Sequence, residues 1–225
     1  MDYSERKNGA MKRTFKTILV VLITAVVVLG IVWAVMSLAT GKWGMRHKSG
    51  AIAPVQADVS DDELTDYVKD ILKAIKDRDY EKLSTVVHPE YGVIFTPYAT
   101  ITLDTDKCFT DKQVADFADN TKKYIWGIYD GSGEPIEMTP AEYFDRFVYD
   151  ADFLNSSSFG IDEVLRVGNS LENIDEVFAD ARYVDCYIPD PKGETEPEWK
   201  SLRLVFEEYN GQLWLTAIVH SEYTI

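Results

Sequence analysis

The sequence has few of the residues that build disulfide scaffolds and metal sites. Its 225 residues include only 2 cysteines and 3 histidines. One pair of cysteines, Cys108 and Cys186, is too few for a disulfide scaffold, although the two could form a single bond outside the cytoplasm. Two cysteines alone also make a poor metal site.

Several catalytic motifs are absent as well. The sequence has no phosphate-binding loop, no dinucleotide-binding glycine fingerprint, no HExxH zinc motif and no GxSxG nucleophile elbow. The acidic turn at 130–134 fails the EF-hand spacing, because Ile128 and Thr139 fall where that loop requires Asp and Glu. We therefore predict no cofactor and no metal ion. A non-catalytic role is favoured and catalysis stays open.

Positive charge is scarce, since 23 Lys and Arg stand against 38 Asp and Glu, a net charge of −15. Residues 1–50 hold 8 of the basic side chains and only 2 of the acids, so residues 51–225 carry 15 against 36, a net charge of −21. Such an acidic domain disfavours nucleic acid and anionic lipid as partners, because both are polyanions. Cations, basic peptides and neutral glycans remain as candidates.

No charge at all occurs in residues 17–40, which are rich in Ile, Leu, Val and Ala. About 20 apolar residues span a bilayer as a helix, whereas the apolar region of a cleaved signal peptide is shorter. More basic residues precede the run than follow it, so the N-terminus is expected in the cytoplasm. The sequence thus predicts a cytoplasmic tail (1–16), an uncleaved signal anchor (17–40) and a C-terminal domain outside a single-pass membrane protein.

The remaining sequence predicts a linker over 41–59 and one domain over 60–225. Ser60 with Glu63 forms a capping box that begins a helix ending near residue 76, and a second helix over 80–87 ends before Pro89. Capping signals at Thr110 and Thr139 begin two further helices. Segments rich in β-branched and aromatic residues predict a strand or a bent hairpin interrupted at Pro97 over 92–103, and strands at 123–129, 181–188, 199–209 and 213–225.

The Asn210-Gly211 dipeptide predicts a type I′ turn that joins the last two strands into a hairpin. Helices followed by a mostly antiparallel sheet are typical of the α+β class. We therefore expect helices packed on a curved, cone-like sheet.

This order of elements resembles the cone-shaped fold of the nuclear transport factor two-like and ketosteroid-isomerase-like superfamily. The likeness lies in the opening helix pair, which ends KDRDYEKL, and in the closing hairpin at 203–220. Three segments resemble more closely a family of uncharacterised surface-exposed proteins of Gram-positive bacteria: HPEYGVIFTP, WGIYDGSGEPI and TPAEYFDRFVYD, at 88–97, 126–136 and 139–150. The resemblance covers 62–225 and implies an extracytoplasmic domain, but no established activity.

Four residues are candidates for ligand binding: Arg203, His220, Trp126 and Tyr98. Arg203 is opposite in strand parity to the expected core face formed by Leu202, Leu204 and Phe206, so we expect a solvated cation paired with acids. A bulge would instead turn Arg203 into the cone as a carboxylate anchor. His220 shares parity with Trp214, which we expect to be buried. Aromatic residues such as Trp126 could line a glycan or peptide groove, although core positions are the commoner outcome.

These observations favour a non-catalytic binding or sensory module of the cell envelope, whose partner is an envelope protein or glycan. One alternative is an envelope hydrolase or isomerase that uses the interior of the cone. Another is a structural accessory subunit of a membrane complex. Two or more ionisable groups around an open cavity would favour the enzyme, and an apolar, filled interior would favour an interaction surface.

Overall fold

The structure of the protein, a computed structural model, describes residues 50–190 and 198–224. The predicted cytoplasmic tail, the signal anchor and residues 41–49 of the predicted linker lie outside the described residues. Within the described part of the chain, no helix has both the length and the hydrophobicity of a membrane span.

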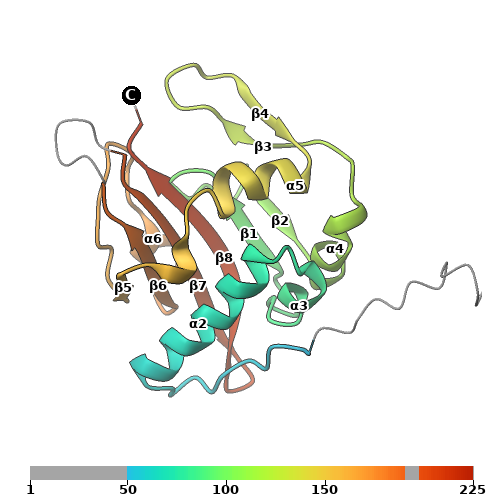
Figure 1. Cartoon of the computed structure of the whole chain (residues 1–225), viewed down its shortest axis with the longest axis vertical. Coiled ribbons are helices and arrows are strands. Elements are labelled where there is room, and N and C mark those ends of the chain that lie inside the picture. Colours follow the sequence, from blue (N-terminus) through green and yellow to red (C-terminus); the bar gives the residue numbers. More distant parts are fainter. Residues whose placement is uncertain (1–49, 191–197, 225) are drawn as a thin grey trace, which may run out of the picture. The chain divides into compact units, whose positions relative to one another are not determined.

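The domain has the predicted α+β architecture (Figure 1). Its main sheet has six strands in the order β2-β1-β8-β7-β6-β5; β1 runs parallel to β8 and the other neighbours are antiparallel. A separate antiparallel pair consists of β3 and β4. The strands are β1 (Val93–Thr96), β2 (Lys107–Phe109), β3 (Tyr124–Ile128), β4 (Pro135–Met138), β5 (Ser158–Ile161), β6 (Arg182–Ile188), β7 (Lys200–Tyr209) and β8 (Gln212–Glu222).

Among the described helices only α2 is long. Figure 1 shows α2 and α5 in front of the sheet. The helices are α2 (Asp61–Lys76), α3 (Tyr80–Ser84), α4 (Asp111–Ala115), α5 (Pro140–Tyr143) and α6 (Ile174–Val177), with 3-10 turns at Asp116–Asp119 and Phe153–Asn155 and a π-helical turn at Phe144–Val148. The capping boxes at Ser60 and Thr110 form as predicted. The second helix ends at Ser84, earlier than expected, and Val87 instead forms a parallel bridge with Leu215 of β8.

Both faces of the main sheet are covered. Leu202, Leu204 and Phe206 pack against the helices in the larger core, as the strand alternation predicts. The opposite face carries a smaller apolar cluster in which Val205 of β7 packs with Ile174 of α6. Arg203 lies on this second face, because it alternates with the residues of the larger core.

A β-bulge breaks the alternation along β8. Val205 pairs with Ala217 and Phe206 pairs with Leu215, so Thr216 has no partner on β7 and the parity of β8 reverses there. Trp214 and His220 therefore face opposite sides of the sheet. Trp214 is only half-buried, so the prediction that it is buried on the face of His220 is wrong.

The closing hairpin forms as predicted, with positive φ at Asn210 (54°) and Gly211 (79°). Cys108 in β2 and Cys186 in β6 are both free, and three strands of the sheet lie between them. The sequence left a disulfide open, and this strand order keeps the two thiols apart.

Candidate functional site

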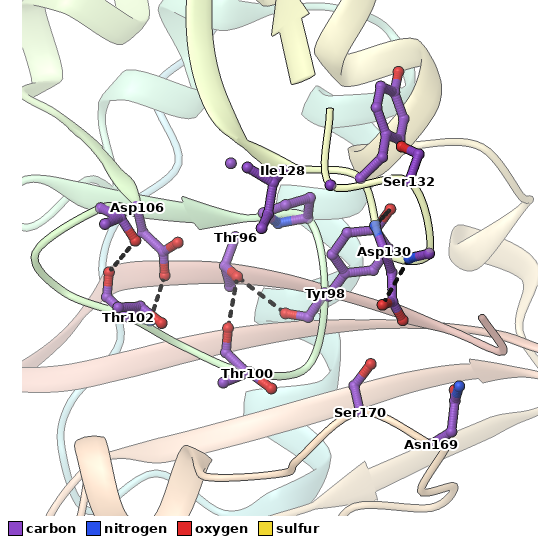
Figure 2. A pocket seen from close by; sticks show the side chains of 16 residues that line it. Thr96, Tyr98, Thr100, Thr102, Asp106, Ile128, Asp130, Ser132, Asn169 and Ser170 are labelled. Carbon is purple, nitrogen blue, oxygen red and sulfur yellow. Dashed lines mark hydrogen bonds between the residues drawn. The ribbon is translucent and has the colours of Figure 1, made fainter. Parts of the chain in front are cut away.

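A pocket of about 660 Å³ opens beside the end of β1. The segment that connects β1 to β2 forms one wall, the β3–β4 hairpin another, and the loop at 169–170 a third. Figure 2 shows Asp106 and Thr102 at one end of the pocket and Asp130 beside Tyr98 at the other, with Asn169 across from them. The volume lies in the range of small-molecule sites.

Hydrogen bonds hold the β1–β2 connection in place. Strand β1 stops before Pro97, which cannot donate to a sheet ladder. The hydroxyl of Thr96 donates to the carbonyls of Tyr98 at 3.0 Å and Thr100 at 3.3 Å, which curls the chain around the pocket (Figure 2). The amide of Asn173 is bonded to the backbone of Ile101 through both its oxygen and its nitrogen, at 2.9 Å each. The wall is therefore largely preformed.

Two carboxylates line the pocket, and they differ in burial. Asp106 is partly buried and accepts a hydrogen bond from the Thr102 N–H at 2.7 Å. Burial raises the pKa of Asp106 to about 6, and this backbone bond and the nearby Lys107 charge offset only part of that effect. Asp130 is exposed; it accepts from the Gly131 N–H at 3.0 Å and from the hydroxyl of Thr224.

The other lining groups are mostly neutral hydrogen-bonding side chains. Thr, Ser and Asn residues supply hydroxyls and one amide, and Tyr98 and Tyr129 supply aromatic rings. Among the described residues that line the pocket, none is Lys, Arg or His. This chemistry opposes an anionic ligand and suits a polyhydroxylated ligand that is neutral or cationic.

His220 lies behind the pocket wall, fully buried on the face of β8 that the helices cover. Its Nδ1 is 3.0 Å from the carbonyl oxygen of Pro97, and its Nε2 is 3.3 Å from Oδ2 of Asp150. Burial alone would raise the pKa of Asp150, but His220 and the paired Lys200 ammonium bring it below its ordinary value. His220 thus supports Pro97, a residue of the wall, and is not itself among the lining residues.

Asp150, His220 and Glu222 have potential metal-ligand atoms within 4.8 Å of one another. The two carboxylates are already paired, because Lys200 contacts Asp150 and Arg146 lies 2.5 Å from Glu222. Two anions and two basic side chains balance, so this cluster is best described as an ion-pair network.

Arg203 is fully buried and is not among the residues that line the pocket. Its guanidinium lies 3.3 Å from Asp185 and 2.5 Å from Glu172, and it also donates to the Arg166 carbonyl at 3.2 Å. Ser201 and the Leu165 N–H also bond the Asp185 carboxylate. The expected pairing with acids is present, but the expected exposure to solvent is wrong, because α6 and the loops around it cover this face.

The other two candidates differ in access. Trp126 is fully buried, stacked on Tyr143 at 3.8 Å between ring centroids, and donates to the Met138 carbonyl at 2.9 Å. Its ring is out of reach of a ligand in this structure. Tyr98 lines the pocket, and its hydroxyl accepts from the Asp130 N–H at 3.3 Å. Binding of a ligand at Tyr98 stays a prediction.

Sequence reasoning missed Asp106 and the threonines around it. The segment TITLDTD at 100–106 was included only in part in a predicted strand. Its signal was available in retrospect: acids and hydroxyls concentrated directly after a proline that ends a strand.

No family model matches the sequence, and no curated protein matches it. A solved structure described as a calcium/calmodulin-dependent protein kinase II association domain from Xanthomonas campestris aligns with 76% of this chain and 92% of its own, at 12% identity and a TM-score of 0.33. At this similarity the match identifies neither a fold family nor a function.

Proposed function

We propose that the domain is a non-catalytic binding module of the cell envelope, and that its pocket takes a neutral or cationic polyhydroxylated ligand of the glycan type. The observation that carries the proposal is the pocket itself: about 660 Å³, lined by hydroxyls, an amide, two tyrosines and two carboxylates, with no basic side chain among its described lining residues.

The lining chemistry supports this ligand class in three ways. The Ser170 hydroxyl can both donate to and accept from sugar hydroxyls, and the Thr100 hydroxyl, which donates to the Leu171 carbonyl, can accept from them. The rings of Tyr98 and Tyr129 offer flat apolar faces for a sugar ring. The hydrogen bonds of the β1–β2 connection reduce the conformational entropy that binding would otherwise lose.

The cellular setting is part of the same proposal. The uncharged run at 17–40 would anchor the chain, with the N-terminus in the cytoplasm and the domain outside. The domain would have the cone-shaped architecture of the nuclear transport factor two-like superfamily, a proposal supported by its opening helix pair, its closing hairpin and the packing of α2 against one face of the sheet.

Titration calorimetry with neutral oligosaccharides tests the proposal. The variant Ser170→Trp places a large side chain in the pocket and should abolish binding. The variant Ser157→Trp adds the same side chain at an exposed position outside the pocket and should bind normally. Equal binding by both variants would contradict this pocket as the site.

An enzyme is the second candidate, because Asp106 and Tyr98 are ionisable groups beside an open cavity. A carboxylate with a pKa of about 6 is suited to act as a general base near neutral pH. The pocket is open to solvent, however, whereas proton-transfer sites generally exclude water. His220 and Arg203 also do not line it. Nuclear magnetic resonance of a bound ligand in D₂O separates the two functions: conversion of the ligand or incorporation of deuterium would establish catalysis.

A further inference from the structure

The two carboxylates of the pocket differ in how well the protein itself satisfies them. Both oxygens of Asp130 accept hydrogen bonds from the chain, one from Gly131 and one from Thr224. Asp106 is more buried, and its carboxylate accepts a hydrogen bond from an uncharged group, the Thr102 N–H. Within 50–190 and 198–224 no basic side chain forms an ion pair with Asp106.

The environment of Asp106 therefore disfavours its negative charge. Its pKa of about 6 expresses that cost, since burial opposes ionisation and the Lys107 charge compensates only in part. A cation supplied from outside would remove the cost. The open side of Asp106 is the pocket, so a bound ligand is the natural source of that cation.

One buried hydroxyl that interacts electrostatically with Asp106 lacks a hydrogen-bond partner. Tyr143 of α5 is almost fully buried, and its hydroxyl makes no hydrogen bond to any described residue. Burial raises the pKa of Tyr143, and the charge of Asp106 raises it further. A phenol that stays protonated has oxygen lone pairs free to accept, and a buried hydroxyl without a partner costs stability.

We propose that the pocket selects a sugar with a free amino group, whose ammonium pairs with Asp106 while its hydroxyls bond to the surrounding threonines and serines. The inference rests on the proposed glycan-binding function and deepens it. An N-acetylated sugar has the same hydroxyls without the charge, and the same sugar with a carboxylate or phosphate would meet two carboxylates and no cation.

Calorimetry on the full-length chain at pH 6.5, above the pKa of about 6 of Asp106 and acidic enough to protonate amino sugars, tests this selectivity with two probes of equal length, oligomers of glucosamine and of N-acetylglucosamine. The charged oligomer should bind about 10- to 100-fold more tightly, the range of one charge-assisted hydrogen bond. Asp106→Asn should reduce its affinity to that of the acetylated oligomer. Asp104→Asn removes the same charge from an exposed residue two positions away and outside the pocket lining, so it should preserve the preference.

The outcomes separate the two proposals. Equal affinity of the wild-type chain for both oligomers overturns the selectivity and leaves glycan binding standing. Binding of neither oligomer contradicts glycan binding and the selectivity together. If Asp104→Asn weakens binding as much as Asp106→Asn, the preference comes from the overall negative charge, and the assignment to Asp106 is wrong. Melting curves of each variant check that it is folded. Asp106→Glu keeps the charge but moves the carboxylate, so it should bind the glucosamine oligomer with intermediate affinity.

Discussion

Arg203→Met removes the guanidinium that pairs with two buried acids, Asp185 and Glu172, on the second face of the sheet. Methionine keeps most of the side-chain volume, so the main change is the loss of charge. Asp185 is fully buried and Glu172 largely so, and both would be left without their cation. Removing one partner of a buried ion pair typically costs about 3 to 5 kcal/mol, and we expect a loss in that range at pH 8.

The loss should depend on pH in a defined direction. Burial already raises the pKa of Glu172 above 4.5 although Arg203 is present, and removing Arg203 raises it further. The folded variant then holds a proton that the unfolded chain releases, so its stability relative to the wild type falls as pH rises above about 4.5. The deficit at pH 5 should be smaller than the deficit at pH 8.

Equilibrium urea denaturation of residues 50–225, followed by tryptophan fluorescence at both pH values, measures the two deficits. Arg182→Met is the matched control, because Arg182 pairs with Asp61 and Asp162 on the exposed surface and should cost no more than about 1 kcal/mol. A deficit below about 1 kcal/mol for Arg203→Met at pH 8, or an equal deficit at both pH values, would refute the reasoning.

Three further predictions use the same denaturation assay. Asp106→Asn should stabilise the domain at pH 7.5 by about 1 kcal/mol, a value discounted for the partial exposure of Asp106. The gain should vanish near pH 3.5, because the raised pKa of Asp106 destabilises the fold only as pH rises from 3.8 through about 6. Destabilisation at pH 7.5 would contradict this prediction. Trp214→Ala should cost about 1 to 2 kcal/mol because Trp214 is half-buried, whereas Leu215→Ala, at a fully buried neighbour, should cost about 2 to 5 kcal/mol; equal costs would argue against the bulge. His88 is buried, and its Nδ1 accepts hydrogen bonds from two backbone N–H groups. Burial lowers the pKa of His88, so the free energy of unfolding should fall as pH drops below 6.5. His88→Gln should make this loss of stability with falling pH smaller.

Local signals in the sequence predicted most of the regular structure. The capping boxes at Ser60, Thr110 and Thr139 each begin a helix, because the bonds that define them join residues three apart. The Asn210-Gly211 turn likewise depends only on two adjacent residues. Short elements without such signals were missed: β4 begins with a proline, and β5 contains Gly160, where a Cβ atom would lie 2.5 Å from the carbonyl oxygen of Glu163.

The errors at the candidate site come from contacts between distant segments. The bulge at Thr216 reverses the parity of β8, and only the pairing with β7 reveals it. The cover over Arg203 comes from residues 162–180, which have no strong secondary-structure pattern. The pocket also joins distant parts of the chain, because Thr100 bonds to the Leu171 carbonyl at 2.7 Å. A pattern read along one segment cannot report such contacts.

The central claim is that the pocket beside Asp106 is where the domain binds its ligand. Chemical-shift mapping of the isotope-labelled chain during titration with a glucosamine oligomer tests this most directly. We predict that the largest amide shifts occur at Thr102, Asp106, Gly131 and Asn169, which lie on all three walls of the pocket. Saturable shifts confined to other surfaces, such as the solvent-facing side of α2, would contradict the claim, as would the absence of any saturable shift.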